Sequence, residues 1–295
     1  AANLVEAFDG ITGLKGDVTI SSAANTVTIA QLKAINKATT GAIAVSAIQT
    51  LSGSAKDLIE ALKDVTLFTG STVEVTGAVT LAQILELQSK FDAADAGNLT
   101  FANTSAALTG TTADILAALD SAPVDYKGAI KVTDAVNAAD LKTINDATDG
   151  AITLTKVSEP LSGDYATITA ALDGITGYKG AITLSDAAND APANINAVAK
   201  LTTGKLIATL DAITDITDAT VTALKDVNTN DSITFAATDA TAFLALSKLI
   251  PTATFANVTG ITEDASQIGT GATNVINALN TLNNGDTTVT LTLTV

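Results

Sequence analysis

The motif Leu51-Ser52-Gly53-Ser54, followed by the helix-like segment at residues 57–62, recurs along this chain and decides its fold class. It returns twice with a similar helix-like segment after it, as Leu-Thr-Gly-Thr at 108–111 and as Leu-Ser-Gly-Asp at 161–164. Gly53, Gly110 and Gly163 are 57 and 53 residues apart, which is two turns of a shorter interval of about 27 residues. Self-similarity of this period predicts stacked repeats that pack on their neighbours.

Strand-like and helix-like segments alternate within this period, and eleven short segments have strand character. Residues 17–20, 129–132, 151–154 and 181–184 alternate, with larger apolar residues on one side and Thr, Asp, Ala or Lys on the other, as expected of a half-buried sheet. Residues 30–35 and 139–144 carry Leu and Ile three positions apart, a helical stripe. Three residues stand where an N-cap would accept backbone N–H groups: Ser54, Thr111 and Asp164.

These elements predict an α/β fold, because strands that are joined by helices run parallel through right-handed crossovers. We expect a parallel solenoid of repeated strand–helix turns, in which one sheet of roughly eleven strands has helices along its opposite side. The prediction is a single solenoid over residues 1–295. It comprises regular repeats at 1–185, degenerate repeats at 186–285 and a terminal strand at 286–295.

Composition excludes several classes of partner. The chain has a formal net charge of −16 and only 15 Lys and Arg residues, which are scattered, whereas nucleic-acid binding needs clustered basic residues. No apolar run approaches the length of a bilayer span, so we expect no membrane insertion.

The chain contains neither Cys nor His, which removes the usual zinc ligands and the commonest general base. We therefore expect no enzymatic activity, because no nucleophile, base and orienting group are linked by the sequence.

Two further patterns suggest ligands, and each has a plainer explanation. The segments at 13–16 and 177–180, Gly-Leu-Lys-Gly and Gly-Tyr-Lys-Gly, superficially suggest phosphate loops, but both stand where a turn precedes a strand. Asp211, Asp215 and Asp218 could supply oxygen ligands to calcium. Because the calcium-binding nonapeptide of β-rolls is absent, we favour solvated surface charge and expect no cofactor, with calcium as the weaker alternative.

The three tyrosines, Tyr126, Tyr165 and Tyr178, could stack on sugars. Tyr126 and Tyr178 occupy equivalent positions of the repeat, where Leu14 and Phe68 stand in other copies. Because apolar residues take the same place, we expect these positions to serve packing rather than ligand binding.

The consensus of the repeat resembles a known class of protein. It runs Leu-Ser/Thr-Gly, then Asp-Ile-Leu-Ala-Ala-Leu, then Tyr-Lys-Gly-Ala-Ile-Thr-Leu-Ser-Asp, and it is similar to repeats of large secreted surface proteins of bacteria, including cyanobacterial ones. The resemblance covers roughly residues 3 to 185 well. It implies an extracellular or cell-surface location and a structural or adhesive role. The start Ala1-Ala2-Asn3 would suit a mature end left by removal of a leader, although a trimmed chain would look the same.

The two ends of the chain predict head-to-tail self-assembly. The chain begins in a helix-like segment and ends in a strand-like one, so stacking the end of one subunit on the start of the next would continue the alternation. The expected interface comprises Leu4, Val5, Phe8, Val289, Leu291, Leu293 and Val295. The leading hypothesis is an extracellular structural protein that assembles into a filament or surface layer. The alternative is a surface adhesin or binding module that presents a Thr-rich sheet face to glycan or ice.

Overall fold

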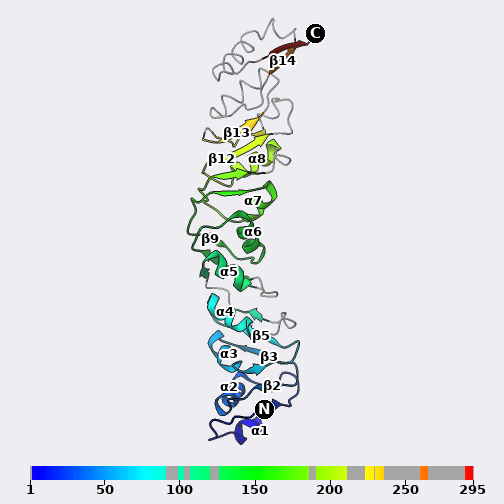
Figure 1. The fold of residues 1–295 in the computed structure, drawn as a ribbon, viewed down its shortest axis with the longest axis vertical. Helices are drawn as coiled ribbons and strands as arrows, with labels where there is room; N and C mark the ends of the chain where they lie inside the picture. The colour runs from blue at the N-terminus through cyan, green and yellow to red at the C-terminus, as the bar shows by residue number, and fades with distance from the viewer. Residues whose placement is uncertain are drawn as a thin grey trace. The chain divides into compact units, whose positions relative to one another are not determined.

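The computed structural model describes residues 2–90, 99–102, 107–119, 126–185, 191–210, 223–228, 230–235, 260–264 and 290–294. Within these residues the protein is a mixed α/β fold of short parallel sheets and helices (Figure 1). The chain divides into two compact units, Ala1–Ala135 with Thr143–Thr155 (unit 1) and Val136–Lys142 with Lys156–Val295 (unit 2). The division falls inside helix α6.

The elements include the strand-like segments predicted at 17–20, 129–132, 151–154 and 181–184 and the helix-like segments predicted at 30–35 and 139–144. The described helices are α1 (Ala2–Ala7), α2 (Ile29–Ala38), α3 (Ala55–Ala61), α4 (Leu81–Gln88), α5 (Thr112–Leu119), α6 (Ala138–Asp146), α7 (Tyr165–Ala171) and α8 (Pro192–Ala199). The described strands are β1 (Val18–Ile20), β2 (Ile43–Val45), β3 (Thr50–Gly53), β4 (Val65–Thr66), β5 (Thr72–Val75), β6 (Leu99–Phe101), β7 (Leu108–Gly110), β8 (Ile130–Val132), β9 (Ile152–Leu154), β10 (Leu161–Gly163), β11 (Ile182–Leu184), β12 (Leu206–Leu210), β13 (Ser232–Phe235), β14 (Gly260–Asp264) and β15 (Thr290–Thr294).

Every strand pair in the described residues is parallel, which confirms the predicted direction. Unit 1 holds three sheets with the strand orders β1-β2-β4, β3-β5-β6 and β7-β8-β9. Unit 2 holds the sheets β10-β11-β12-β13 and β14-β15. The expectation of one sheet with about eleven strands was wrong for these residues. The Leu-Ser/Thr-Gly motif, expected only to lead into a helix, itself forms β3, β7 and β10, so a turn such as β2–β3 carries two strands that join different sheets.

The strands bury one face, as their alternation predicts. In β1, β2, β8 and β9 the outer two residues are buried and the middle residue is exposed. The buried side chains are aliphatic and stand in register across the sheets, for example Val18 opposite Ile43 and Ile43 opposite Val65. The helices lie along the strands and cover this face in unit 1, where α2, α3 and α4 contact one another in sequence (Figure 1).

The predicted N-caps are confirmed. Ser54, Thr111 and Asp164 accept the backbone N–H of Asp57, Asp114 and Thr167 at 3.1, 3.2 and 2.6 Å. Pro192 occupies the first turn of α8, where its missing N–H leaves no hydrogen bond unmade.

Amide side chains link the ends of successive helices. Asn36 of α2 donates to the carbonyl of Ala61 at the end of α3 at 2.8 Å, and Gln88 of α4 donates to the carbonyl of Ala118 in α5 at 2.6 Å. The last carbonyls of a helix have no partner within it. Each amide therefore satisfies a carbonyl in the helix that follows.

A second link joins successive turns, and we call it the Thr–Gly clamp. The Thr39 hydroxyl donates to the carbonyl of Gly16 at 2.8 Å and accepts the N–H of Gly41 at 3.0 Å. The same pair of hydrogen bonds recurs at two other places, from Thr148 to Gly128 and Gly150, and from Thr202 to Gly180 and Gly204. Each clamp therefore ties a Thr-x-Gly turn to the Lys-Gly turn that stands 20 to 23 residues before its threonine.

The clamp predicts which glycines cannot be replaced. A Cβ at Gly150 would lie 2.2 Å from the carbonyl oxygen of Gly128, whereas a Cβ at Gly77 would meet nothing within 4 Å. We expect Gly150→Ala to lower the free energy of unfolding by about 1–3 kcal/mol, the usual cost of overpacking, and Gly77→Ala to change it far less. Denaturant melts of both variants test this. Equal stability of the two variants would contradict the clamp.

Candidate functional site

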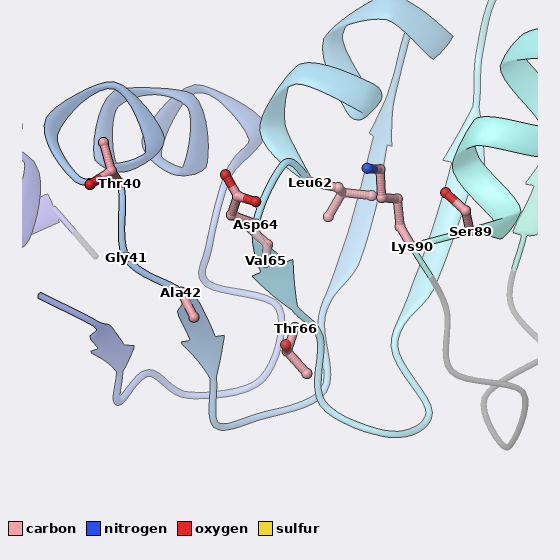
Figure 2. Close-up of a pocket in the computed structure, with 9 residues that line it drawn as sticks. All are labelled: Thr40, Gly41, Ala42, Leu62, Asp64, Val65, Thr66, Ser89 and Lys90. Carbon is pink, nitrogen blue, oxygen red and sulfur yellow. The ribbon is translucent and has the colours of Figure 1, made fainter. Parts of the chain in front are cut away.

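A groove beside β4 is the candidate site in unit 1. It has a volume of about 540 Å³ and is lined by Thr40, Gly41, Ala42, Leu62, Asp64, Val65, Thr66, Ser89 and Lys90. Figure 2 shows residues 40–42, ahead of β2, on one side of residues 62–66, and Ser89 and Lys90, after α4, on the other. The groove is therefore built from three successive turns.

The chemistry that this lining offers is limited. Asp64 and Lys90 are its ionisable side chains, and Thr40, Thr66 and Ser89 contribute hydroxyls. A hydroxyl becomes a nucleophile when a neighbouring base removes its proton, most often an imidazole, and the chain contains no His. The groove offers polar groups to a ligand, and it lacks the usual activating base.

Asp64 has an unusual backbone. Its φ is 54°, in the left-handed region, and its carbonyl accepts the N–H of Ile43 at 2.8 Å. Gly10 and Gly174 take the same place after their helices with φ of 77° and 69°. The turn after the helix therefore requires a left-handed residue, and Asp is one of the few side chains that tolerates this.

We expect Asp64→Val to destabilise the protein by about 1–2 kcal/mol, because a β-branched side chain is strained in the left-handed region. Asp64→Gly should retain the stability of the parent chain, since glycine takes this conformation readily. Thermal melts of both variants, beside Lys63→Val as the exposed neighbour, test the assignment. A valine that is tolerated equally at positions 63 and 64 would refute it.

The residues of the predicted assembly interface lie in both units. Val5 lies in α1 and Phe8 directly after it, both half-buried, and Leu4 also belongs to α1, which packs against α2 in unit 1. Leu291 and Leu293 belong to β15 in unit 2, which pairs with β14. Val289 and Val295 lie outside the described residues. The helix and the strand on which the prediction rested are present, and the interface itself stays a prediction.

Two tyrosines pack in the core, as their positions predicted. Tyr126 is 1% exposed and meets the ring of Phe101 edge to face, with centroids 5.6 Å apart. Tyr178 is 2% exposed, and its hydroxyl donates to the carbonyl of Glu159. Burial raises the pKa of Tyr126, and it raises the pKa of Tyr178 to about 12 together with the negative charge of Glu159. Neither ring is available to stack on a sugar.

Tyr165, Leu14 and Phe68 are less buried than Tyr126 and Tyr178. Tyr165 begins α7 and is half-buried. Leu14 and Phe68 are 38% and 47% exposed, so the expectation that these equivalent positions all serve packing was wrong for them.

The carboxylates with the best-defined environments hold backbone groups. Asp231 is 1% exposed and accepts the N–H groups of Leu206 and Asn228 at 2.7 and 2.8 Å. Asp134 accepts the N–H and the hydroxyl of Thr112 at 2.7 and 2.9 Å. Desolvation alone would raise the pKa of Asp134. The hydrogen bonds from Thr112 outweigh it and hold this pKa below its usual value. The sequence alone did not indicate the contacts of Asp134 with Thr112 and of Asp231 with Leu206, because these partners are 22 and 25 residues away.

The remaining ligand hypotheses have the following outcomes. Gly13 and Gly177 have φ of 76° and 74° and lie in turns that precede β1 and β11, which confirms the turn interpretation. The candidate calcium ligands Asp211, Asp215 and Asp218 lie outside the described residues. In the part of the chain that is described, no three acidic side chains gather closely enough to hold a metal ion.

Comparison with known proteins gave no relatives. No family model, curated protein or solved structure matched the chain. Within the described ranges, none of the helices has the length and apolar character needed to cross a bilayer.

The burial of Tyr178 predicts an alkaline transition. A phenol whose pKa is raised from 10 to about 12 on folding contributes stability below pH 10, and this contribution is lost as the pH rises through 12. Because the chain has no Trp, the near-ultraviolet absorbance of tyrosinate can follow the titration. We expect Tyr178→Phe to remove the component that titrates near pH 12, and Tyr165→Phe to leave it. A titration that is unchanged in Tyr178→Phe would contradict the assignment.

Proposed function

We propose that this chain is an extracellular structural protein that assembles with copies of itself into a filament or surface layer, and that its strand–helix turns form one α/β solenoid. One observation carries the proposal. The same contacts join successive turns at several places, namely the three Thr–Gly clamps and the amide links between helices. In such a fold each turn is held by its neighbours rather than by a central core.

The proposed role is structural and not enzymatic. The chain lacks His and Cys, and the best-defined carboxylates serve as acceptors for backbone N–H groups. The resemblance of the repeat consensus to secreted bacterial surface proteins supports a location outside the cell. We propose that its partner is itself, and that it binds neither nucleic acid nor a cofactor; the net charge of −16 disfavours the former.

A second candidate is an adhesin or binding module that recognises glycan or ice. Hydroxyl side chains stand on the outer face of two sheets, at Thr109 and Thr153 in one sheet and at Ser162 and Thr183 in the other. Lys131 interrupts one row and Ile207 continues the other, so the hydroxyl array is not uniform. Binding on a glycan array, or inhibition of ice recrystallisation, by a chain that stays monomeric would favour this candidate.

The proposed function predicts concentration-dependent assembly. Purified chain should sediment as species larger than the monomer as its concentration rises, and electron microscopy should show filaments or sheets. Moderate salt should promote this, because it screens the repulsion between copies of charge −16. A chain that stays monomeric at every concentration and salt tested would overturn the proposal.

A further inference from the structure

The atoms that cap the described helices fall into two chemical classes. Helices α2 to α6 are capped by oxygens that carry no charge, the hydroxyl or amide oxygens of Thr28, Ser54, Thr80, Thr111 and Asn137. Helix α7 is capped by a carboxylate, because Asp164 accepts the N–H of Thr167 at 2.6 Å. Among the described helices with a side-chain cap, α7 is therefore the one whose cap loses its charge in acid.

Helix α4 shows how a neutral cap is completed. The hydroxyl of Thr80 accepts the N–H of Gln83 at 3.3 Å, and the side-chain oxygen of Gln83 accepts the N–H of Thr80 at 3.0 Å. No titratable group takes part in this capping box. Asp164 and Thr167 stand at the same two positions of α7, so α7 carries a carboxylate where α4 carries a hydroxyl.

Helix α7 is also weaker than α4 in sequence and packing. Its seven residues, Tyr-Ala-Thr-Ile-Thr-Ala-Ala, include one aromatic and three β-branched residues, which favour a helix less than leucine or alanine does. The hydroxyl of Thr169 donates to the carbonyl of Tyr165 at 2.8 Å, a bond that slightly destabilises helices. Ile168 is the one large apolar side chain that α7 itself buries, whereas α4 buries three. The stability of α7 therefore depends strongly on its first turn.

The charges around the cap are few. Helix α7 and the elements that pack on it or pair beside it, β10, β11 and α8, contain no Asp, Glu, Lys or Arg, and their titratable group is the phenol of Tyr165. The start of α6 lies beside Gly163, and the part of α6 in unit 2 carries Asp140 and Lys142. Within the described residues no ion pair joins either of them to Asp164.

Acid acts directly on the cap of α7. Hydrogen bonds from the backbone N–H and the hydroxyl of Thr167 hold the pKa of Asp164 below its ordinary value of 3.8. A carboxyl whose pKa is lowered on folding contributes stability above its ordinary pKa, and this contribution is lost as the pH falls through the folded value. Protonation also removes the attraction between the carboxylate and the positive end of the helix. A pH below 3.8 therefore weakens the cap of α7 and leaves the cap of α4 unchanged.

We infer that α7 is an acid-sensitive element of this fold, which opens from its capped end when Asp164 is protonated while α4 stays closed. Opening frees the first N–H groups of the helix and uncovers the buried side chain of Ile168. A single helix can open in this way because stability is not uniform along a fold. The inference goes beyond the proposed function and does not depend on association between copies.

The test is amide hydrogen exchange of the full chain at about pH 5.5 and about pH 3, corrected for the intrinsic exchange rates. We expect the protection of the amides in α7 to fall by about fivefold to tenfold on acidification, since the loss of a cap shifts a local opening equilibrium by about that factor. The protection of α4 should fall by less. Both helices are measured in the same molecule, so conditions that act on the whole chain are shared.

Three variants tie the result to the cap. Asp164→Thr with Thr167→Gln gives α7 the neutral box of α4 and should abolish the excess acid sensitivity of α7. Asp164→Ser provides a neutral cap through a single change and should have the same effect, since serine is a favoured capping residue. Asp140→Asn is the matched control, because it removes an equal charge from α6 in unit 2 and should leave the acid sensitivity of α7 unchanged. Thermal melts at neutral pH show that the variants fold.

Each outcome decides the inference. A selective loss of protection in α7, abolished by the neutral caps and kept in Asp140→Asn, supports it. An equal loss of protection in α4 and α7 of the parent chain overturns it, as does acid sensitivity of α7 that persists in Asp164→Ser or disappears in Asp140→Asn. A single acid transition in which every helix loses protection together also overturns it, because α7 would then not open by itself.

Discussion

The structure depends on the distance between successive turns, which the Thr–Gly clamp fixes. One threonine hydroxyl donates to a glycine carbonyl of the preceding turn and accepts the N–H of the glycine two residues after it. The two glycine backbones then lie so close that a Cβ at Gly41, Gly150 or Gly204 would meet a carbonyl oxygen at 2.2–2.4 Å. The strands that start beyond each clamp are thereby held in register, because their first residues are already placed.

Such a clamp is needed because the individual elements are short. Most strands have three or four residues, so each pairing contributes few backbone hydrogen bonds, and helices of six to ten residues are marginal on their own. Backbone groups at the ends of such elements need partners. The carboxylates of Asp134 and Asp231 and the amides of Asn36 and Gln88 supply them from neighbouring turns. Polar side chains at these positions thus stabilise the repeat, which accounts for them without a catalytic role.

Local rules predicted the parts of this structure that depend on local sequence. The helix caps at Ser54, Thr111 and Asp164 were predicted because a hydroxyl or carboxylate before a helix accepts its free N–H groups. The parallel direction of the strands was predicted because strands and helices alternate along the sequence. The second strand in the β2–β3 turn was not predicted, because pairing of Leu51 with Val73 depends on a residue in the next turn. The partners of Asp231 and Thr39 were missed for the same reason. The exposure of Leu14 and the burial of Tyr178 could not be predicted, because both stand in the same local pattern of Gly-x-Lys-Gly.

Association between copies has to overcome charge. Two chains of −16 repel one another, but salt screens this repulsion over a Debye length of about 8 Å at physiological ionic strength. Apolar burial and strand pairing act only at contact and only where the groups match. A contact between copies would therefore need apolar groups and strand edges that match closely enough to outweigh the remaining repulsion.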